Sequence, residues 1–365
     1  MSTSYVNETM GFVEKAYNET VPENGISFIE SERLRRDPTF LLPFVFYEGF
    51  LVVVGAVGNI LIIGAYVVVK SMRTLPNTFV FSLAISNFMV TSILQPFMMV
   101  GALMGEQFIL VQRPGLCTVI TYVCIQSCMS SSSNIMLVSL NRYICICKNS
   151  WYSKIYSKKS VAVMIMAAWF NGFVWNVFLW VGWSEVSFER KQFTCMWNRQ
   201  KNFSYHVIGL AICAVLVPVS VTAVSYILIL LKVKESKKKI QAFNKKDKNQ
   251  STSSDIRLAR MLFIMFAVYC ILCAPYAFIT TFDFNDQAPY YWYATFLHMF
   301  HTNSAVNFII YGITNKSFRT GYSLFSKYIL IKLSCGAYQP RKMVENDIDK
   351  SQMTQTMTIA TTAHS

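Results

Sequence analysis

The sequence predicts an all-α fold, a seven-transmembrane helix bundle with a short amphipathic cytoplasmic helix after the seventh span. Hydrophobic residues make up 53% of the 365 residues and charged residues only 14%, which is too apolar for a soluble globular domain. Seven apolar segments are long enough to cross a bilayer, and backbone polar groups in lipid must be paired within helices. These segments span residues 41–69, 77–104, 114–147, 160–182, 203–233, 255–282 and 290–313.

The basic residues predict the orientation of the spans. The net charge of +14 could attract nucleic acid, but the lysines and arginines cluster in particular loops, most densely over residues 232–248. Cytoplasmic loops carry an excess of basic residues, so we expect these loops inside the cell and no nucleic-acid partner. Seven crossings then place the N-terminus outside a multi-pass protein of the plasma membrane.

Residues 1–40 are expected to form an extracellular glycosylated segment. They are polar and have no apolar core before Leu41, so no cleavable signal peptide is predicted. Asn7 and Asn18 each begin a glycosylation sequon, and Asn202 begins a third one in an outer loop. We therefore predict these three asparagines as glycan acceptors.

Two of the ten cysteines are expected to form a disulfide. Cys117 begins the third span at the outer surface and Cys195 lies midway along the second outer loop, so both face an oxidising compartment. The bond would tie that loop over the bundle; the alternative is two unpaired surface thiols. Cys335, beyond the last span, is a predicted palmitoylation site. The thiols inside the spans are interpreted as core residues with no metal role, namely Cys124, Cys128, Cys213, Cys270 and Cys273.

Polar residues recur in the spans in a fixed order. Arg142 lies near the inner end of the third span, and its charge could simply snorkel to the lipid headgroups. The full series is Gly58-Asn59, Leu83-Ala84 with Asn87, Asn141-Arg142-Tyr143, Trp169, Pro218 with Tyr226, Ala274-Pro275, and Asn303-Ser304 followed by Asn307-Phe308-Ile309-Ile310-Tyr311. Each match alone is weak, but together and in order they are highly specific. Over residues 41–325 the chain resembles the rhodopsin-like class of G-protein-coupled receptors.

This resemblance implies a receptor and not an enzyme, with no cofactor and no metal. It would convert extracellular ligand binding into activation of a heterotrimeric G protein through outward movement of the sixth helix. Arg142 would pair with Asp255 at the start of that helix in the inactive state, and Tyr226 and Tyr311 would stabilise it in the active state. The activation switch that the resemblance implies comprises Asn141, Arg142, Tyr143, Tyr226, Asp255, Asn307 and Tyr311.

Within the class the chain looks most like melatonin receptors. The similarity lies in Asn141, where most of the class has an acid, in the run Ile144-Cys145-Ile146-Cys147, and in Phe308, where most members have proline. It makes an inhibitory G protein the first expected partner. Ala214 stands where melatonin receptors carry a histidine in the fifth helix, so the chain resembles a melatonin receptor with a changed pocket, and melatonin is not the expected ligand.

The expected ligand cavity is apolar and aromatic. Cys124 stands where amine receptors have an aspartate, and His301 stands where visual pigments have the retinal lysine, so neither ligand class is favoured. A small neutral or weakly polar ligand is expected instead. For each aromatic residue the alternative is helix packing or a place at the membrane interface. The predicted wall residues are Cys124, Cys128, Leu210, Ala214, Tyr276, Ala277, Thr280, Tyr293, Leu297 and His301, with His298 as a second informative histidine.

A polar cluster is expected at mid-membrane, from Asn59, Asn87, Ser131, Asn303 and Ser304, next to Asn307. In the wider class an aspartate at the position of Asn87 helps to bind a sodium ion that favours the inactive state. Because this charge is missing, we predict weak or absent sodium modulation. Tyr269 and Cys273 replace the phenylalanine and tryptophan of the family pattern, so the coupling between pocket and sixth helix is expected to differ.

The chain beyond the seventh span is divided into two parts. Residues 314–327 have apolar Phe318, Tyr322 and Phe325 on one face, which predicts an amphipathic helix on the inner membrane surface in contact with lipid. Residues 328–365 are expected to form a disordered cytoplasmic tail, rich in hydroxyls toward its end, that recruits arrestin-type proteins once phosphorylated.

Other functional classes have weaker support. A transporter would show an internal repeat, and a membrane enzyme would need paired carboxylates or a set of metal ligands, and the spans suggest neither. Two alternatives stay open. One is an atypical non-signalling receptor that acts as a decoy or scaffold, and the other is an opsin-derived protein that lacks the retinal lysine.

Overall fold

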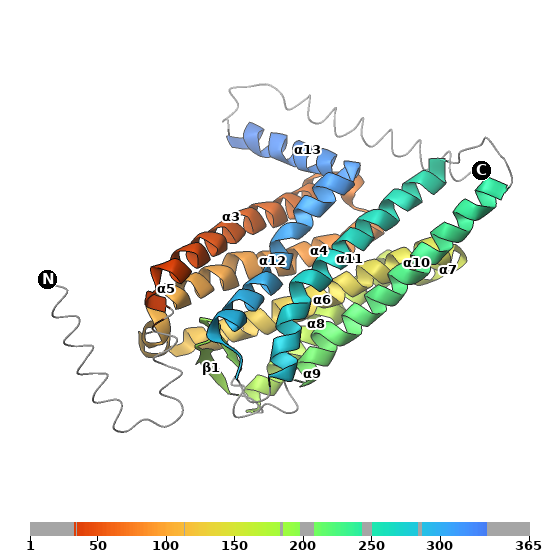
Figure 1. Ribbon diagram of the computed structural model, residues 1–365. Helices are drawn as coiled ribbons and strands as arrows, with labels where there is room; N and C mark the ends of the chain where they lie inside the picture. The colour runs from red at the N-terminus through yellow and green to blue at the C-terminus, as the bar shows by residue number, and fades with distance from the viewer. Residues whose placement is uncertain are drawn as a thin grey trace, which may run out of the picture.

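The computed structural model describes residues 33, 35–112, 114–182, 185–197, 208–242, 250–283 and 287–333. The predicted glycosylation sites Asn7, Asn18 and Asn202 and the predicted palmitoylation site Cys335 lie outside these residues. Nearly all of the described chain is helical, with one two-stranded sheet (Figure 1).

The described helices and strands follow one another in a simple order along the chain. They are α3 (Pro38–Val68), η1 (Lys70–Met72), α4 (Leu75–Met89), η2 (Val90–Leu94), α5 (Gln95–Gln112), α6 (Pro114–Cys147), α7 (Asn149–Ile155), α8 (Lys158–Trp180), β1 (Val186–Glu189), β2 (Thr194–Trp197), α9 (Ile208–Ala211), η4 (Ile212–Leu216), α10 (Val217–Ala242), α11 (Gln250–Phe282), α12 (Tyr290–Thr314) and α13 (Lys316–Leu333).

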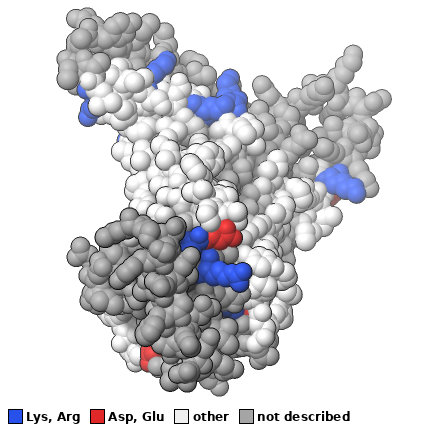
Figure 2. All heavy atoms as spheres, turned by 60° about the vertical axis from the view of Figure 1, so that its left-hand side comes forward, with Lys and Arg blue, Asp and Glu red and all other residues white. Residues whose placement is uncertain are grey.

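The prediction of a seven-helix bundle is confirmed. Within the described residues, six helical stretches are long and apolar enough to cross a membrane, and α12, with 25 residues, lies beside them as the seventh helix of the bundle. The third span, α6, begins and ends at the predicted residues 114 and 147. In Figure 2 most of the described surface is uncharged, and the lysines and arginines in view form a few separate groups.

Two of the long helices contain a π-helical turn, and both turns lie just before a proline. The segment η2 precedes Pro96 and the segment η4 precedes Pro218. Proline lacks the N–H that would continue the α-helical ladder, and its ring clashes with the preceding turn. The helix accommodates this with one wide turn, and in η2 the Thr91 hydroxyl donates to the carbonyl oxygen of Asn87 at 3.1 Å.

The helix α6 lies at the centre of the bundle. It packs against α4, α8 and α10, while α12 packs against α11 and α3 (Figure 1). Close approach between α3 and α12 depends on Gly58, because a Cβ atom there would lie 2.0 Å from the ring of Phe308. The small residues of these helices therefore allow close packing, as is usual in membrane bundles.

The two ends of the bundle differ in what covers them. At one end, the hairpin end, β1 and β2 form an antiparallel pair in which Phe188 is opposite Cys195. At the other end, the α13 end, α13 runs across the bundle (Figure 1) and buries Phe318, Gly321 and Leu324. The helix α13 ends at Leu333, so it is longer than the predicted 314–327 and includes the first residues of the predicted tail.

Candidate functional site

The hairpin is held over the bundle by a disulfide. Cys117, near the start of α6, is bonded to Cys195 in β2, which confirms the predicted pair. The hairpin also needs Gly101 in α5, because a Cβ atom there would lie 2.0 Å from the carbonyl oxygen of Phe193. This turn therefore packs directly against the α5 backbone and closes one end of the bundle.

A cavity of about 90 Å³ lies beneath the hairpin. Its lining is almost wholly apolar and comes from α6, β2, α9, η4, α11 and α12. Nine of the ten predicted wall residues line it, namely Cys124, Cys128, Leu210, Ala214, Tyr276, Ala277, Thr280, Leu297 and His301. The volume exceeds what one water molecule needs and suits several waters or a small organic group.

Tyr293 is the predicted wall residue that does not line this cavity. Its side chain is fully buried in a packed cluster with Tyr276 and Leu297, and its hydroxyl donates to Asp283 at 2.9 Å. The cavity wall also includes Met196 and Trp197 of β2, which the sequence did not nominate. They reach the cavity only because the disulfide sets the position of β2, and the presence of Cys195 was the available signal.

Polar contacts anchor the hairpin to α11 and α12. The Tyr276 hydroxyl donates to the side-chain oxygen of Gln192 at 3.0 Å. The Lys191 ammonium donates to the carbonyl oxygen of Ala288 at 3.1 Å and lies over the rings of Tyr290 and Tyr293. These contacts connect the cover of the cavity to the helices that form its wall.

Asp283 organises the connection between α11 and α12. Partial burial alone would raise the pKa of its carboxyl, but backbone N–H groups of Ala288 and Gln287, the Tyr293 hydroxyl and the charge of Lys191 outweigh burial and lower the pKa below its usual range. The two backbone hydrogen bonds measure 3.0 and 2.8 Å. Asp283 is therefore expected to be ionised at neutral pH and to hold this turn in place.

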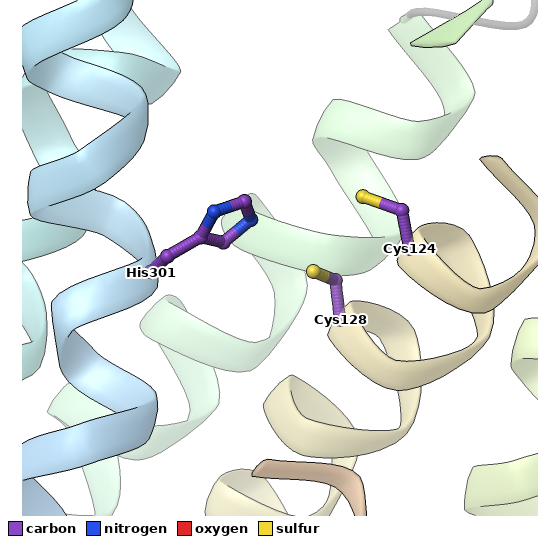
Figure 3. A group of neighbouring side chains, drawn as sticks. All are labelled: Cys124, Cys128 and His301. Carbon is purple, nitrogen blue, oxygen red and sulfur yellow. The ribbon is translucent and has the colours of Figure 1, made fainter. Parts of the chain in front are cut away.

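Three chemically reactive side chains meet in the cavity wall. The sulfur atoms of Cys124 and Cys128, on successive turns of α6, and a ring nitrogen of His301, on α12, all lie within 4.8 Å of one another. Figure 3 shows the imidazole pointing from α12 toward the two thiols. The sequence interpretation of these thiols as core residues did not foresee this cluster, because the sequence does not show that His301 faces Cys124 and Cys128.

A buried acid and a histidine lie side by side near the hairpin end. Glu48 of α3 is 0% exposed, and its carboxylate contacts Nδ1 of His298 on α12. The ring of Phe44 packs edge-on against the same imidazole, with centroids 4.2 Å apart. His298 was nominated from the sequence, but Glu48 was not, because the chain alone does not reveal which faces of the first and seventh helices meet.

The predicted mid-membrane polar residues are buried and partly connected. Ser131 donates to the side-chain oxygen of Asn87 at 2.9 Å, and the Asn59 amide donates to the carbonyl oxygen of Ser304 at 3.0 Å. Asn303 and Asn307 line a second, much smaller cavity of about 10 Å³. The amide nitrogen of Asn87 has no hydrogen-bond partner among the described residues. Among the described side chains, no carboxylate belongs to this cluster.

Arg142 lies among tyrosines near the α13 end. It interacts electrostatically with the hydroxyls of Tyr226 on α10, Tyr311 on α12 and Tyr152 on α7. No described acid lies within ion-pair distance of Arg142, and its Nε atom has no hydrogen-bond partner among the described residues. The side chain of Asp255, its predicted partner, lies outside the described side chains.

The residues beside Arg142 pack into the surrounding structure. The Asn141 amide donates to the hydroxyl of Tyr152 at 3.4 Å, and Tyr143 packs against the core at this end of the bundle. Tyr226 packs on Phe266 of α11, and Tyr311 stacks on Phe318 of α13. The described switch residues therefore connect α6, α7, α10, α11, α12 and α13 within one layer.

Comparison with known proteins identifies relatives of two kinds. The chain is 27% identical to melanopsin-B of Xenopus laevis over 73% of its own length and 51% of that protein. It is 26% identical to melatonin receptor type 1C of Xenopus laevis, over 78% of this chain and 66% of that receptor. It is 27% identical to melatonin receptor type 1A of Ovis aries, over 75% of this chain and 74% of that receptor. The chain thus spans about half the length of the melanopsin.

The fold has a solved counterpart. Squid rhodopsin superimposes with a TM-score of 0.67 over 86% of this chain and 91% of that one, at 19% identity, which establishes a shared fold. The sequence model for the 7 transmembrane receptor (rhodopsin family) matches residues 58–311, well over half of the chain. With the bundle, the disulfide and the ordered polar positions described above, the match shows that this chain belongs to the rhodopsin family of seven-transmembrane receptors, which are signalling receptors and not enzymes.

Proposed function

We propose that the protein is a G-protein-coupled receptor that detects a small neutral or weakly polar ligand in the cavity beneath the hairpin. The observation that carries this is the largely apolar lining of a cavity of about 90 Å³, whose polar side chains are His301, Thr280, Tyr276 and Trp197 beside the thiols of Cys124 and Cys128. The described lining offers no carboxylate to pair with a cationic ligand, and His301 replaces the lysine that a covalent retinal linkage needs.

The proposed orientation places the hairpin end outside the cell and the α13 end in the cytoplasm. The disulfide Cys117–Cys195 at the hairpin end fits an oxidising compartment. Lys148, Lys154 and Lys158 lie near the other end of α6 and in the segment that follows, which fits the cytoplasmic excess of positive charge. The amphipathic helix α13 would lie on inner-leaflet lipid, and the tail beyond it would recruit arrestin-type proteins when phosphorylated.

The proposed transduction step is a change in the partners of Arg142. In the inactive state the arginine would pair with Asp255, and ligand binding would favour a state in which α11 moves outward and Tyr226 and Tyr311 stabilise the released guanidinium. An ion pair of this kind contributes only about 0–1 kcal/mol when exposed, so helix packing must carry much of the difference between the states. An inhibitory G protein is the first partner to test.

The experiment is a nucleotide-exchange screen. The full-length receptor in lipid nanodiscs is mixed with purified heterotrimeric G proteins, inhibitory type first, and challenged with indoles, lipids and peptides, in light and in darkness. Arg142→Ala serves as the control. We expect exchange that depends on a compound and is lost in the control.

A second candidate function is that of a non-signalling decoy or scaffold. Asn87, Tyr269, Cys273 and Phe308 all depart from the activation pattern of the class, and this favours it. The same screen separates the two functions. If the wild type and Arg142→Ala are indistinguishable with every G protein, with and without compounds, the scaffold is supported and signalling is contradicted.

A further inference from the structure

The cluster of Cys124, Cys128 and His301 has the composition of a metal site. The cysteines are four residues apart in α6, so their side chains lie on one face of the helix, one turn above the other. His301 faces them from α12, and the three donor atoms lie within 4.8 Å of one another. Figure 3 shows the two sulfur atoms and the imidazole directed into the same space.

The imidazole of His301 lacks the partners that a buried histidine normally has. It is 3% exposed, and neither of its ring nitrogens has a hydrogen-bond partner among the described residues. An unpaired polar group inside a bundle raises the free energy of the folded state. Nearby, by contrast, the Tyr276 hydroxyl is paired with Gln192. The unpaired imidazole indicates a ligand that occupies the space between it and the thiols.

The donor set selects the chemical class of that ligand. Two sulfur donors and one imidazole suit Zn²⁺, whereas Ca²⁺ and Mg²⁺ require oxygen ligands that the cluster does not offer. With Zn–S bonds near 2.3 Å and Zn–N bonds near 2.0 Å, the donor atoms of a tetrahedral site lie about 3.6 Å apart. Side-chain rotations must therefore bring the two most distant donor atoms of the cluster roughly 1 Å closer to each other.

Charge also favours this ion. Two thiolates and one Zn²⁺ make a neutral unit, and a neutral unit is much less costly to bury in an apolar cavity than an isolated charge. A monovalent copper ion on the same two thiolates would leave a net negative charge. On binding Zn²⁺ the two thiols release their protons to solvent.

We propose that Cys124, Cys128 and His301 form a three-ligand Zn²⁺ site that joins α6 to α12, with the fourth coordination position open to the cavity. All three residues line that cavity of about 90 Å³. A water molecule or a nitrogen, oxygen or sulfur atom of a small ligand would fill the open position, as in zinc sites with three protein ligands. The site does not depend on G-protein coupling.

Metal binding to the purified receptor tests this proposal. The full-length receptor in nanodiscs, purified under inert gas so that the Cys117–Cys195 disulfide stays intact and then freed of metal, is titrated with Zn²⁺ against a chromophoric chelator and, separately, with Co²⁺. We expect one Zn²⁺ that the triple variant Cys124→Ser, Cys128→Ser, His301→Ala does not bind, and a thiolate-to-cobalt charge-transfer band. Each single substitution should weaken Zn²⁺ binding by at least about 100-fold. Removing a residue that only hydrogen-bonds to a metal ligand already costs up to about 100-fold in affinity, and loss of a ligand itself should cost at least as much.

Matched variants keep the outcome interpretable. Cys270→Ser removes a thiol of α11 that lies outside the cluster, and it should bind Zn²⁺ like the wild type. If His301→Ala fails to fold, His301→Phe refills the volume without a donor atom, and melting curves identify the folded variants. The proposal is overturned by the absence of the charge-transfer band, by unchanged affinity in the folded His301 variant, or by mass spectrometry showing a Cys124–Cys128 disulfide in the receptor isolated without reductant.

Discussion

The cavity at the hairpin end and the polar layer at the α13 end are built in opposite ways. The cavity at the hairpin end has a volume of about 90 Å³ and a largely apolar wall that contains thiols and one imidazole. The small cavity next to the polar layer has a volume of only about 10 Å³ and lies between Tyr226, Tyr269, Asn307 and Tyr311. One end has room for a small molecule, while the other is a packed layer of hydrogen-bonding groups around Arg142.

This difference explains where family resemblance and individuality lie. In the proposed orientation the α13 end contacts the G protein, a transducer that serves many receptors, and this would account for the family residues Arg142, Tyr226 and Tyr311 at that end. A ligand-specific cavity is free to change, and Ala214 and His301 depart there from the patterns of melatonin receptors and visual pigments. Single substitutions can therefore disturb one end of the bundle and leave the other intact.

The buried pair Glu48–His298 is the most sensitive point at the hairpin end. Glu48→Ala leaves the imidazole buried without its partner, and we expect a loss of about 3–5 kcal/mol in the free energy of unfolding, measured by denaturation in nanodiscs. Replacing both residues with leucine should recover most of that loss, because no buried polar group is then left without its partner. Equal instability of the single and double variants would show that the pair itself is not the cause.

The disulfide is expected to have the next largest effect. Cys117→Ser with Cys195→Ser should lower the free energy of unfolding by about 2–5 kcal/mol, because the bond closes a long loop of the unfolded chain. Met196 and Trp197 would then leave the cavity wall, so ligand binding should fall while agonist-independent nucleotide exchange persists. Loss of that exchange in a folded variant would contradict the separation of the two ends.

Asn87→Asp tests the region between the two ends. The added carboxylate, beside Ser131, supplies the charge that a sodium ion needs. We expect sodium to lower agonist affinity in this variant by about tenfold, or roughly 1.4 kcal/mol, and to have no such effect on the wild type. The control replaces sodium by a larger monovalent cation, and clear sodium sensitivity of the wild type would refute the interpretation of Asn87.

Asp283 is expected to give the smallest effect. The pKa of its carboxyl is lowered in the folded state, so its contribution to stability is present above the unfolded pKa of about 3.9 and is lost as the pH falls through the lowered value. Melting temperatures measured from pH 6 downward should show this loss in the wild type. Asp283→Asn should have a lower melting temperature at pH 6, and its curve should be flatter below about pH 4.

Much of this fold could be predicted because the membrane imposes simple rules on sequence. Length and apolarity located the spans, and α6 begins and ends where expected. The two π-helical turns were not predicted, although Pro96 and Pro218 indicate where they occur. The extent of α13 was underestimated because the prediction rested on the spacing of Phe318, Tyr322 and Phe325, whereas the residues beyond Lys327, up to Leu333, are mostly apolar and do not continue that amphipathic pattern.

The candidate site was predictable only in part, since it depends on contacts between distant segments. The disulfide was predictable from the positions of two cysteines, but the approach of Met196 and Trp197 to the cavity follows from the hairpin that the bond fixes. The pairing of Glu48 with His298 and the meeting of two thiols with His301 depend on which helix faces meet. No local pattern in the sequence contains that information.

The central claim is that occupancy of the cavity at the hairpin end is coupled to the Arg142 layer at the α13 end. Coupling is reciprocal, so a nucleotide-free G protein should tighten the binding of an agonist found in the screen by roughly 5–150-fold. The direct measurement is agonist affinity with and without G protein, for the wild type, Arg142→Ala and the cavity-filling variant Ala214→Trp.

We expect Arg142→Ala to bind the agonist like the wild type without G protein and to show no tightening with it, while Ala214→Trp binds weakly in both conditions. An agonist that binds the wild type equally with and without G protein, or that is tightened just as much in Arg142→Ala, would contradict the account.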